Sequence, residues 1–298
     1  MVFQHPLAYL LGLEGVALLR AFAGEHGQEF AEARIAEVRR LLDSPELKGP
    51  GVTAERVSTV AGYRVWSQTY DNPGNGLFAV DEPLVRGTVD GLPPGVALDA
   101  ACGTGRYAEY LVGRGHRTIG VDSSPEMLDR ARTRVPGAEF RQGDLHRLPV
   151  PDDHADVIVC ALALVHLSDL GPAFAEFARV LRPGGRLLIT DVHQEIVALG
   201  SVPRMRSAEG EPGLLSAHRH RAADYLGAAL PLGLRVRRCE EPHRAAGPVP
   251  GELPAEIVTG AWDDWPWSLL GLVPAAAAAA WDDLPAVIFW DFELTEGG

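Results

Sequence analysis

The sequence contains few cysteines and little positive charge. Three cysteines, Cys102, Cys160 and Cys239, are far apart among 298 residues and form no C-x-x-C pair. This usage disfavours a zinc knuckle or a dithiol redox motif, so we expect no metal site and a cytoplasmic protein with reduced thiols. Acidic residues outnumber basic ones, 40 against 27, and no Lys/Arg-rich run is present. A surface of that charge repels a phosphate backbone, so we expect no nucleic-acid partner.

Long apolar runs are also missing. The N-terminal stretch PLAYLLGLEGVALLRAF is interrupted by Glu14 and Arg20 and follows no basic segment, so we do not interpret it as a signal peptide. No run reaches the roughly 18 uninterrupted apolar residues that a membrane helix needs, and we expect no membrane partner. An apolar content of 46% with 22% charged residues is typical of a globular chain.

Residues 7–42 are predicted to be helical. Leu7, Leu11 and Phe22 fit a helical spacing, and the segment EFAEARIAEVRRLL places its apolar residues on one side. The stretch DSPELKGPG then interrupts the pattern. We therefore expect residues 1–60 to form an N-terminal helical extension, either as a cap on the main domain or as the arm of a homodimer.

From about residue 93 onward, strand-like and helix-like segments alternate. The seven strand candidates are VALDA, RTIGVD, AEFRQGD, ADVIVCALAL, GRLLITDV, LRVRRCEEP and AVIFWDFEL. The helix after the second strand has Ser124 as its expected N-cap and Pro125 at its first position. This alternation predicts an α/β fold with a doubly wound, mostly parallel seven-stranded sheet of the Rossmann-like kind. We assign residues 61–298 to this domain.

The region of about 243–285, between the last two strands, is predicted to be an aromatic-rich insertion. It contains WDDWPW and a run of alanines that we expect to form a helix from Pro274. Its tryptophans can pack between the two strands, or they can form an aromatic wall for a flat or apolar ligand. The tryptophans concerned are Trp262, Trp265, Trp267 and Trp281, together with Trp290 in the last strand.

The stretch LDAACGTGRYA follows the pattern G-x-G-x-x-A at the end of the first strand. That spacing suits a dinucleotide, and it also suits a methyl donor that carries a cationic sulfonium. Asp99 discriminates between them, because a carboxylate beside an anionic pyrophosphate is unfavourable. Asp122 can accept hydrogen bonds from ribose hydroxyls of either cofactor, and Asp144 can accept from an adenine amino group. The sequence therefore favours the methyl donor over a nicotinamide cofactor.

Four motifs in sequence order resemble those of class I S-adenosylmethionine-dependent methyltransferases. They are LDAACGTGR, GVDSSPEML, GDLHRLPVPDDHADVIVCALALVHL and RVLRPGGRLLITD, and the resemblance covers about residues 63–193. It is to the small-molecule type, which is related to quinone and natural-product methyltransferases. The resemblance implies S-adenosylmethionine as the cofactor and S-adenosylhomocysteine as its product.

The same resemblance implies roles for individual residues. Asp122 with Ser123 would bind ribose, and Met127 would pack on the adenine. Asp144 and the backbone of Leu145 would hold the adenine edge. The segment YRVWSQTYD is similar to a helix that covers the donor in many relatives. The residues implied in cofactor binding are Tyr63, Tyr70, Asp99, Ala101, Gly103, Gly105, Arg106, Asp122, Ser123, Met127, Asp144, Leu145 and Ala161.

One of these residues departs from the family pattern. Ala101 stands where glycine is usual, and its methyl group bears on fine positioning within the loop. Because Gly103 and Gly105 remain, the resemblance itself is unaffected.

Methyl transfer to oxygen usually needs a general base, for which histidine is the simplest candidate. His166 and His193 follow the fourth and fifth strands, at the sheet edge where ligands bind in open α/β folds. His220 lies in SAHRHRAADYL, where relatives often place residues that contact the acceptor. We predict His220 as the base, followed by His193 and His166, with capping or surface roles as the alternatives.

The predicted function is transfer of a methyl group from S-adenosylmethionine to a small apolar or aromatic molecule. Oxygen, nitrogen and carbon acceptors all stay open. The N-P-P-Y and Pro-Cys motifs of nucleic-acid base methyltransferases are absent, which agrees with a small-molecule acceptor. The alternative is a protein of this fold that binds the donor but catalyses another reaction, such as a cyclisation, or serves as a binding subunit.

Overall fold

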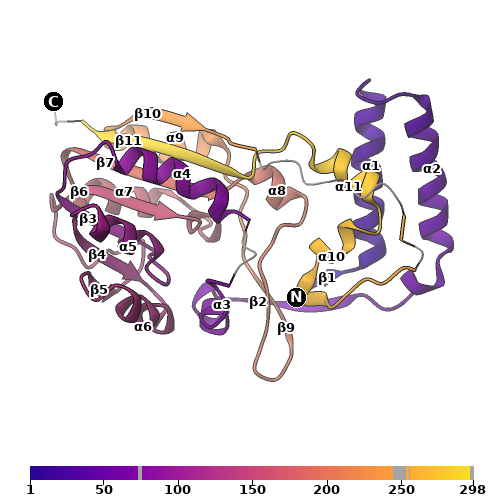
Figure 1. The fold of residues 1–298 in the computed structure, drawn as a ribbon, viewed down its shortest axis with the longest axis horizontal. Helices are drawn as coiled ribbons and strands as arrows, with labels where there is room; N and C mark the ends of the chain where they lie inside the picture. Colours follow the sequence, from indigo (N-terminus) through magenta and orange to yellow (C-terminus); the bar gives the residue numbers. More distant parts are fainter. Residues whose placement is uncertain (73–75, 244–252, 255, 296–298) are drawn as a thin grey trace. The chain divides into compact units, whose positions relative to one another are not determined.

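The computed structural model describes residues 1–72, 76–243, 253–254 and 256–295 (Figure 1). The chain divides into two compact units. The accessory unit comprises Met1–Arg56, Arg204–Leu214 and Ala245–Leu284. The sheet unit comprises Val57–Pro203, Leu215–Arg244 and Pro285–Gly298. The boundary after residue 60 and the insertion at about 243–285 stay predictions, and residues 244–252 and 255 of that insertion lie outside the described residues.

The sheet unit is built on a seven-stranded sheet in the order β10-β11-β7-β6-β3-β4-β5. Its strands are β3 Val96–Ala100, β4 Arg117–Asp122, β5 Glu139–Gln142, β6 Ala155–Ala161, β7 Leu181–Val192, β10 Leu234–Glu240 and β11 Val287–Leu294. Strands β3 to β7 pair in parallel, whereas β11 runs antiparallel to both β7 and β10. The predicted mostly parallel seven-stranded sheet is confirmed.

Helices pack on both faces of this sheet, as Figure 1 shows. Leu98 of β3 belongs to a buried cluster with Phe174 of α7 (Gly171–Val180), whereas its neighbour Ala97 belongs to a second cluster with Leu111 of α5 (Arg106–Gly113). Successive strand residues face opposite sides, so a strand covered on both faces is apolar throughout. The helices and 3-10 turns of this unit are α3 Thr59–Trp66, α4 Phe78–Val89, α5 Arg106–Gly113, α6 Pro125–Arg134, η2 Leu164–His166, α7 Gly171–Val180, α8 Gln194–Ala198, α9 Ala222–Ala229 and η3 Leu230–Leu232.

Two strands differ from the prediction at their ends. β6 stops at Ala161, three residues early, because Leu162 adopts a left-handed conformation with φ of 55° and turns the chain. β7 already begins at Leu181, four residues before the predicted strand GRLLITDV, and includes the Pro-Gly-Gly sequence, where the chain turns tightly. Its pairing with β6 skips from Leu181 to Arg186, and Gly184 has φ of 78°. The turn therefore exists as an irregularity inside the strand.

The accessory unit contains the predicted N-terminal helices. α1 Pro6–Phe22 and α2 Gln28–Asp43 confirm the helical region, with a break at residues 23–27. α11 Pro274–Trp281 begins at the expected proline. The other elements are η1 Pro45–Leu47, η4 Trp262–Asp264, α10 Trp267–Leu270 and a sheet of β1 Val2–Gln4, β2 Val52–Val57, β9 Pro212–Leu215 and β8 Arg204–Arg206. The last residues of β2 and β9, Val57 and Leu215, already belong to the sheet unit. Across the described ranges, no helix is both long and apolar enough to cross a membrane.

The tryptophans of the C-terminal region have partners within their own units. In the accessory unit, Trp262 Nε1 donates to Gln4 Oε1 at 2.9 Å, and Trp265 Nε1 donates to the carbonyl of Thr259 at 3.0 Å. Trp290 is buried in the core of the sheet unit. The satisfied N–H groups of Trp262 and Trp265 are typical of packing residues, whereas Trp290 Nε1 has no hydrogen-bond partner among the described residues.

Candidate active site

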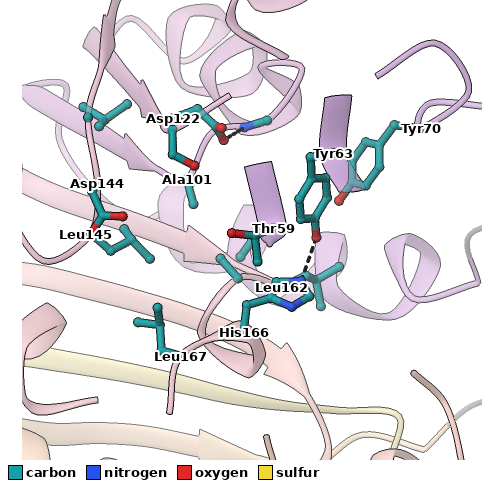
Figure 2. A pocket seen from close by; sticks show the side chains of 16 residues that line it. Thr59, Tyr63, Tyr70, Ala101, Asp122, Asp144, Leu145, Leu162, His166 and Leu167 are labelled. Atoms are coloured by element: carbon teal, nitrogen blue, oxygen red, sulfur yellow. Dashed lines mark hydrogen bonds between the residues drawn. The ribbon is translucent and has the colours of Figure 1, made fainter. Parts of the chain in front are cut away.

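A pocket opens at the carboxyl ends of β3, β4, β5 and β6 (Figure 2). Parallel strands bring their carboxyl ends to one edge of the sheet, which is where open α/β folds bind ligands. The lining residues are Thr59, Tyr63, Tyr70, Ala101, Gly103, Val121, Asp122, Ser123, Gly143, Asp144, Leu145, Ala161, Leu162, Ala163, His166 and Leu167.

The loop after β3 forms part of the pocket wall. Ala101, Gly103 and Gly105 have positive φ values of 60°, 52° and 84°. These conformations turn the chain tightly from β3 into α5, which begins at Arg106. A Cβ built on Gly103 would meet no protein atom within 4 Å, although this glycine lines the pocket. The space beside Gly103 is therefore open to a ligand and would be narrowed by a side chain.

Asp122 stands at the end of β4 and holds this loop in place. Its Oδ2 accepts a hydrogen bond from Gly103 N at 2.8 Å, and its Oδ1 accepts one from Ser124 N at 2.8 Å. Each carboxylate oxygen has two acceptor positions, so capacity remains for hydroxyl groups in the pocket. Burial raises the pKa of Asp122, and the backbone N–H groups partly offset this rise.

The charge of the lining favours a cationic ligand. Asp122 and Asp144 contribute carboxyl groups, and no lysine or arginine lies among the described lining residues. The Asp144 side chain is 62% exposed and accepts from His146 N at 2.8 Å. Asp122 suits the ribose of either cofactor, but the described lining offers a pyrophosphate no compensating cation, whereas its net negative charge favours a ligand that carries a sulfonium. The residues present therefore fit S-adenosylmethionine better than a dinucleotide.

Aromatic side chains occupy the other end of the pocket. Figure 2 shows Asp144 and Leu145 on one side and Tyr63 and Tyr70 on the other. The rings of Tyr63 and Tyr70 meet edge to face with centroids 5.8 Å apart. Tyr63 Oη lies 2.9 Å from Nε2 of His166. This end combines apolar ring surface with two hydrogen-bonding groups.

Asp99 lies beneath the loop and outside the lining. Its buried Oδ2 accepts from Ala108 N at 2.8 Å and thereby holds the first turn of α5. Burial raises the pKa of Asp99 to about 7, against the opposing effect of the Ala108 N–H. Asp99 thus acts on the pocket through the backbone that it positions, and its predicted contact with the donor stays a prediction.

Three further residues implied in cofactor binding also lie outside the lining. Arg106 donates to both carboxylate oxygens of Asp81, at 3.1 and 2.9 Å, so its charge already has a partner. Met127 is buried, and its N–H donates to Ser124 Oγ at 3.3 Å at the start of α6. Gly105 is the residue before α5. Arg106 thus links α5 to α4, and Met127 and Gly105 lie at the starts of α6 and α5, beside the pocket.

Of the three predicted bases, His166 lies in the lining and the other two do not. His220 Nε2 lies 3.1 Å and 2.9 Å from the carbonyl oxygens of Leu164 and Leu167, so this ring anchors the η2 turn. His193 precedes α8, where its Nδ1 accepts from Glu195 N at 3.3 Å as an N-cap. Of the three, His166 is thus the one placed in the pocket lining, and which histidine acts as the base stays a prediction.

Several lining residues were missed by the sequence analysis. Leu162 lines the pocket because its left-handed backbone turns it there, and nothing in a leucine predicts that conformation. Gly143 could have been found in the QGD motif, since a Cβ there would lie 2.5 Å from Pro149 Cδ. The other missed residues are Thr59, Val121, Ala163 and Leu167.

Residues 98–189 match a family model described as a methyltransferase domain. The chain is 33% identical over 142 residues to a malonyl-[acyl-carrier protein] O-methyltransferase of Yersinia pestis, covering 47% of this chain and 52% of that protein. It is 38% identical over 104 residues to a demethylmenaquinone methyltransferase of Deinococcus radiodurans, covering 33% of this chain and 43% of that protein. The chain thus spans about half the length of these curated relatives.

A solved S-adenosylmethionine-dependent methyltransferase from Mesorhizobium loti shares the fold, with a TM-score of 0.52 and 21% identity. The alignment covers 74% of this chain and all of that one, 100%. Strands β3 to β7 and the loop after β3 lie in or around residues 98–189, the segment that matches the methyltransferase domain. Residues 98–189 therefore match a methyltransferase domain, and the chain shares the fold of the solved S-adenosylmethionine-dependent methyltransferase.

Proposed function

We propose that this protein transfers a methyl group from S-adenosylmethionine to a small apolar or aromatic molecule. The observation that carries the proposal is the acidic pocket at the carboxyl ends of β3 to β6, open beside Gly103. Carboxylates without a neighbouring lysine or arginine attract a sulfonium and repel a phosphate. The match of residues 98–189 to a methyltransferase domain supports the same donor.

The lining residues have separate proposed roles. Asp122 with Ser123 accepts hydrogen bonds from the ribose, and Asp144 with Leu145 holds the adenine edge. Tyr63 and Tyr70 contact the methionine part, and Ala161 closes the pocket. When bound, S-adenosylmethionine supplies a methyl group activated by its sulfonium, while the protein supplies position and electrostatics. In this proposal Asp99, Gly105, Arg106 and Met127 shape the elements that hold the donor.

Calorimetric titration with S-adenosylhomocysteine tests the donor site directly. We expect saturable binding to the wild-type protein, and an absence of binding would exclude the proposal. Mass spectrometry of small aromatic acceptors after incubation with S-adenosylmethionine then distinguishes two activities. A gain of one methylene unit supports methyl transfer, and an unchanged mass in a converted product supports a reaction such as cyclisation.

Asp122→Asn should weaken S-adenosylhomocysteine binding by about 10- to 100-fold. Loss of one charge-assisted hydrogen bond removes about 1.5–3 kcal/mol, and asparagine keeps one acceptor for the loop. Asp129→Asn on α6 is the matched control, because the Asp129 side chain is 75% exposed and does not line the pocket. Calorimetry should show less than a twofold change for the control. Equal affinities for both variants would contradict the proposed ribose contact.

We also propose that the accessory unit serves as a cap or as the arm of a homodimer, as its N-terminal helices suggest. Its α1 ends with two exposed apolar side chains, Leu19 at 69% and Phe22 at 93%. Such side chains suit contact with another surface.

A further inference from the structure

Tyr63 and His166 form a hydrogen-bonded pair within the pocket lining. Tyr63 belongs to α3 and His166 to η2, and the atoms Oη and Nε2 are 2.9 Å apart. On the other side of the ring, His166 Nδ1 lies 2.7 Å from the carbonyl oxygen of Ser216. Figure 2 shows the Tyr63 hydroxyl directed at the His166 ring. The imidazole is thus held at both nitrogens.

The Ser216 carbonyl decides which nitrogen of His166 carries the hydrogen. A carbonyl oxygen only accepts, so Nδ1 must be the donor. Burial lowers the pKa of His166; the Ser216 carbonyl opposes this, and nearby His218 adds to the lowering. The ring is therefore neutral at pH 7, with Nε2 as an acceptor. It follows that Tyr63 donates its hydroxyl hydrogen to Nε2.

The groups around the pair keep Tyr63 protonated and favour positive charge. Burial raises the pKa of Tyr63 well above its usual value, and Tyr70, Asp122 and Asp191 raise it further. Beside His166 the titratable neighbour is His218. The carboxylates of Asp122 and Asp191 stabilise a positive charge on the pair, and they disfavour a negative charge on Tyr63.

We propose that Tyr63 and His166 together remove the proton of the methyl acceptor, and that the accepting group is a hydroxyl. This inference rests on the proposed methyl transfer. A neutral amine and an ionised carboxylate attack without losing a proton first, so neither needs a base. A hydroxyl is a weak nucleophile until a base takes its proton. The neutral imidazole of His166, hydrogen-bonded to the phenol of Tyr63, can take the proton that a hydroxyl acceptor must lose.

The proton has a defined path in this step. The acceptor oxygen forms a bond to the methyl carbon, and the electron pair of the carbon–sulfur bond stays on sulfur. The acceptor proton passes to Tyr63 Oη while the Tyr63 hydrogen passes to His166 Nε2. One positive charge disappears from sulfur and one appears on the imidazole, so the net charge of the pocket is unchanged. The imidazolium keeps its Nδ1–H bond to Ser216 and later releases the proton to solvent.

The first test observes the imidazole in the protein without donor. Nitrogen-15 NMR of histidine-labelled protein, assigned with His166→Gln, should show a neutral ring with hydrogen on Nδ1 at pH 7. Its titration midpoint should lie below the usual value of about 6.5. His220 is the internal control with the opposite tautomer, because two carbonyl oxygens face its Nε2. Hydrogen on Nε2 of His166, or a charged ring at pH 7, would overturn the proposal.

The second test compares three probes that differ in the accepting group alone. They are methyl 4-hydroxybenzoate, methyl 4-aminobenzoate and monomethyl terephthalate. We expect transfer to the phenol, with kcat falling in acid through the midpoint measured for His166. His166→Gln keeps an acceptor for Tyr63 but takes no proton, so kcat should fall about 10²–10⁴-fold and the acid limb should vanish. His26→Gln, in the accessory unit, should keep wild-type kcat and pH profile.

Calorimetry with S-adenosylhomocysteine distinguishes a failure of the proposed base from a failure of the proposed methyl transfer on which it rests. A wild-type protein that does not bind this ligand refutes the donor site itself. Binding combined with transfer to the amine or carboxylate in preference to the phenol refutes the proposed base alone. The same holds if His166→Gln methylates the phenol as fast as the wild type. If none of the three probes is methylated, the NMR test of His166 decides whether the proposal stands. A neutral ring with hydrogen on Nδ1 supports it, and hydrogen on Nε2 or a charged ring at pH 7 overturns it.

Discussion

Ala101 and Leu162 adopt a backbone conformation that residues with a side chain rarely take. Their φ values are 60° and 55°, and both residues line the pocket. The left-handed region costs about 1–2 kcal/mol for a residue with a Cβ atom. Strained residues of this kind concentrate at functional sites, where the surrounding structure holds them in place. The strain here lies at the ends of the adjacent strands β3 and β6.

Ala101→Gly should raise the free energy of unfolding by up to about 1 kcal/mol. The substitution relieves about 1–2 kcal/mol of strain, and the greater freedom of glycine in the unfolded chain costs about 0.5–1 kcal/mol. Ala100→Gly is the control, because Ala100 is buried in regular strand. It should lower the same free energy by about 1–2 kcal/mol through entropy and lost apolar contact. Urea unfolding that shows equal losses for both variants would rule out strain at Ala101.

At the scale of elements, one buried carboxylate joins α4, α5 and β7. Asp81 of α4 is 0% exposed and accepts two hydrogen bonds from Arg106. Tyr107 Oη donates to it at 2.8 Å, and Thr190 Oγ1 donates at 3.3 Å. The guanidinium also lies 4.1 Å from the centre of the Phe78 ring. Arg106, implied by the family resemblance in donor binding, thus anchors the helix that follows the loop.

Asp81→Asn should lower the free energy of unfolding by about 3 kcal/mol. Removing one partner of a buried ion pair costs about 3–5 kcal/mol when the other charge is left uncompensated. Arg106 is 13% exposed and keeps Glu82 Oε1 at 3.1 Å from its Nη1, so we expect a loss at the lower end of that range. Asp90→Asn, at the end of the same helix, is the control because Asp90 and its partner Arg114 are each nearly half exposed. An exposed pair contributes at most about 1 kcal/mol. Chemical denaturation would contradict the anchoring role if the two variants lost the same stability.

Buried carboxyl groups link the stability of the whole molecule to pH. Burial raises the pKa of Asp99 to about 7 and that of Asp191 to about 6. The unfolded chain releases these protons near pH 4, so the folded state binds more protons between pH 4 and 7. The free energy of unfolding therefore decreases as the pH rises through this interval. The contribution of each group is greatest in acid and is lost at alkaline pH.

Asp99→Asn should lose less stability than the wild type between pH 5 and pH 8. Asparagine accepts from Ala108 N but does not ionise, so the cost of a buried charge at alkaline pH is removed. The difference should reach a few kcal/mol, at about 1.4 kcal/mol for each unit of pKa difference. Thermal or urea unfolding at the two pH values measures it. Parallel curves for wild type and variant would show that Asp99 ionises as easily in the folded state as in the unfolded one.

Asp156→Asn provides the opposite case as a control. Burial acts to raise the pKa of Asp156, but hydrogen bonds from Val96 N and Arg182 outweigh it and lower the pKa. A depressed pKa stabilises the ionised folded state, and this contribution is lost only as the pH falls toward the folded pKa. The loss of stability between pH 5 and 8 should therefore match the wild type.

Local patterns predicted most elements of the sheet unit. β3 and β4 have the bounds of the segments VALDA and RTIGVD, and α6 begins after Ser124, whose Oγ accepts from Met127 N. Such signals act between residues a few positions apart, so the elements that they specify can be predicted from the sequence. The end of β6 was not predictable, because the left-handed turn at Leu162 is imposed by its surroundings. The same reason explains why Leu162 was missed in the pocket.

The sequence by itself determined the order of strands and helices and the presence of Asp122 and Asp144 just where strands end. Both follow from short-range hydrophobic periodicity and turn chemistry, which need no knowledge of distant contacts. Tertiary structure alone decided which histidine faces the pocket. Tyr63 and His166 are 103 positions apart, and Ser216 lies another 50 beyond, so only the folded chain brings the three together. The Ser216 carbonyl then determines the tautomer of His166, which cannot be predicted from the residue types alone.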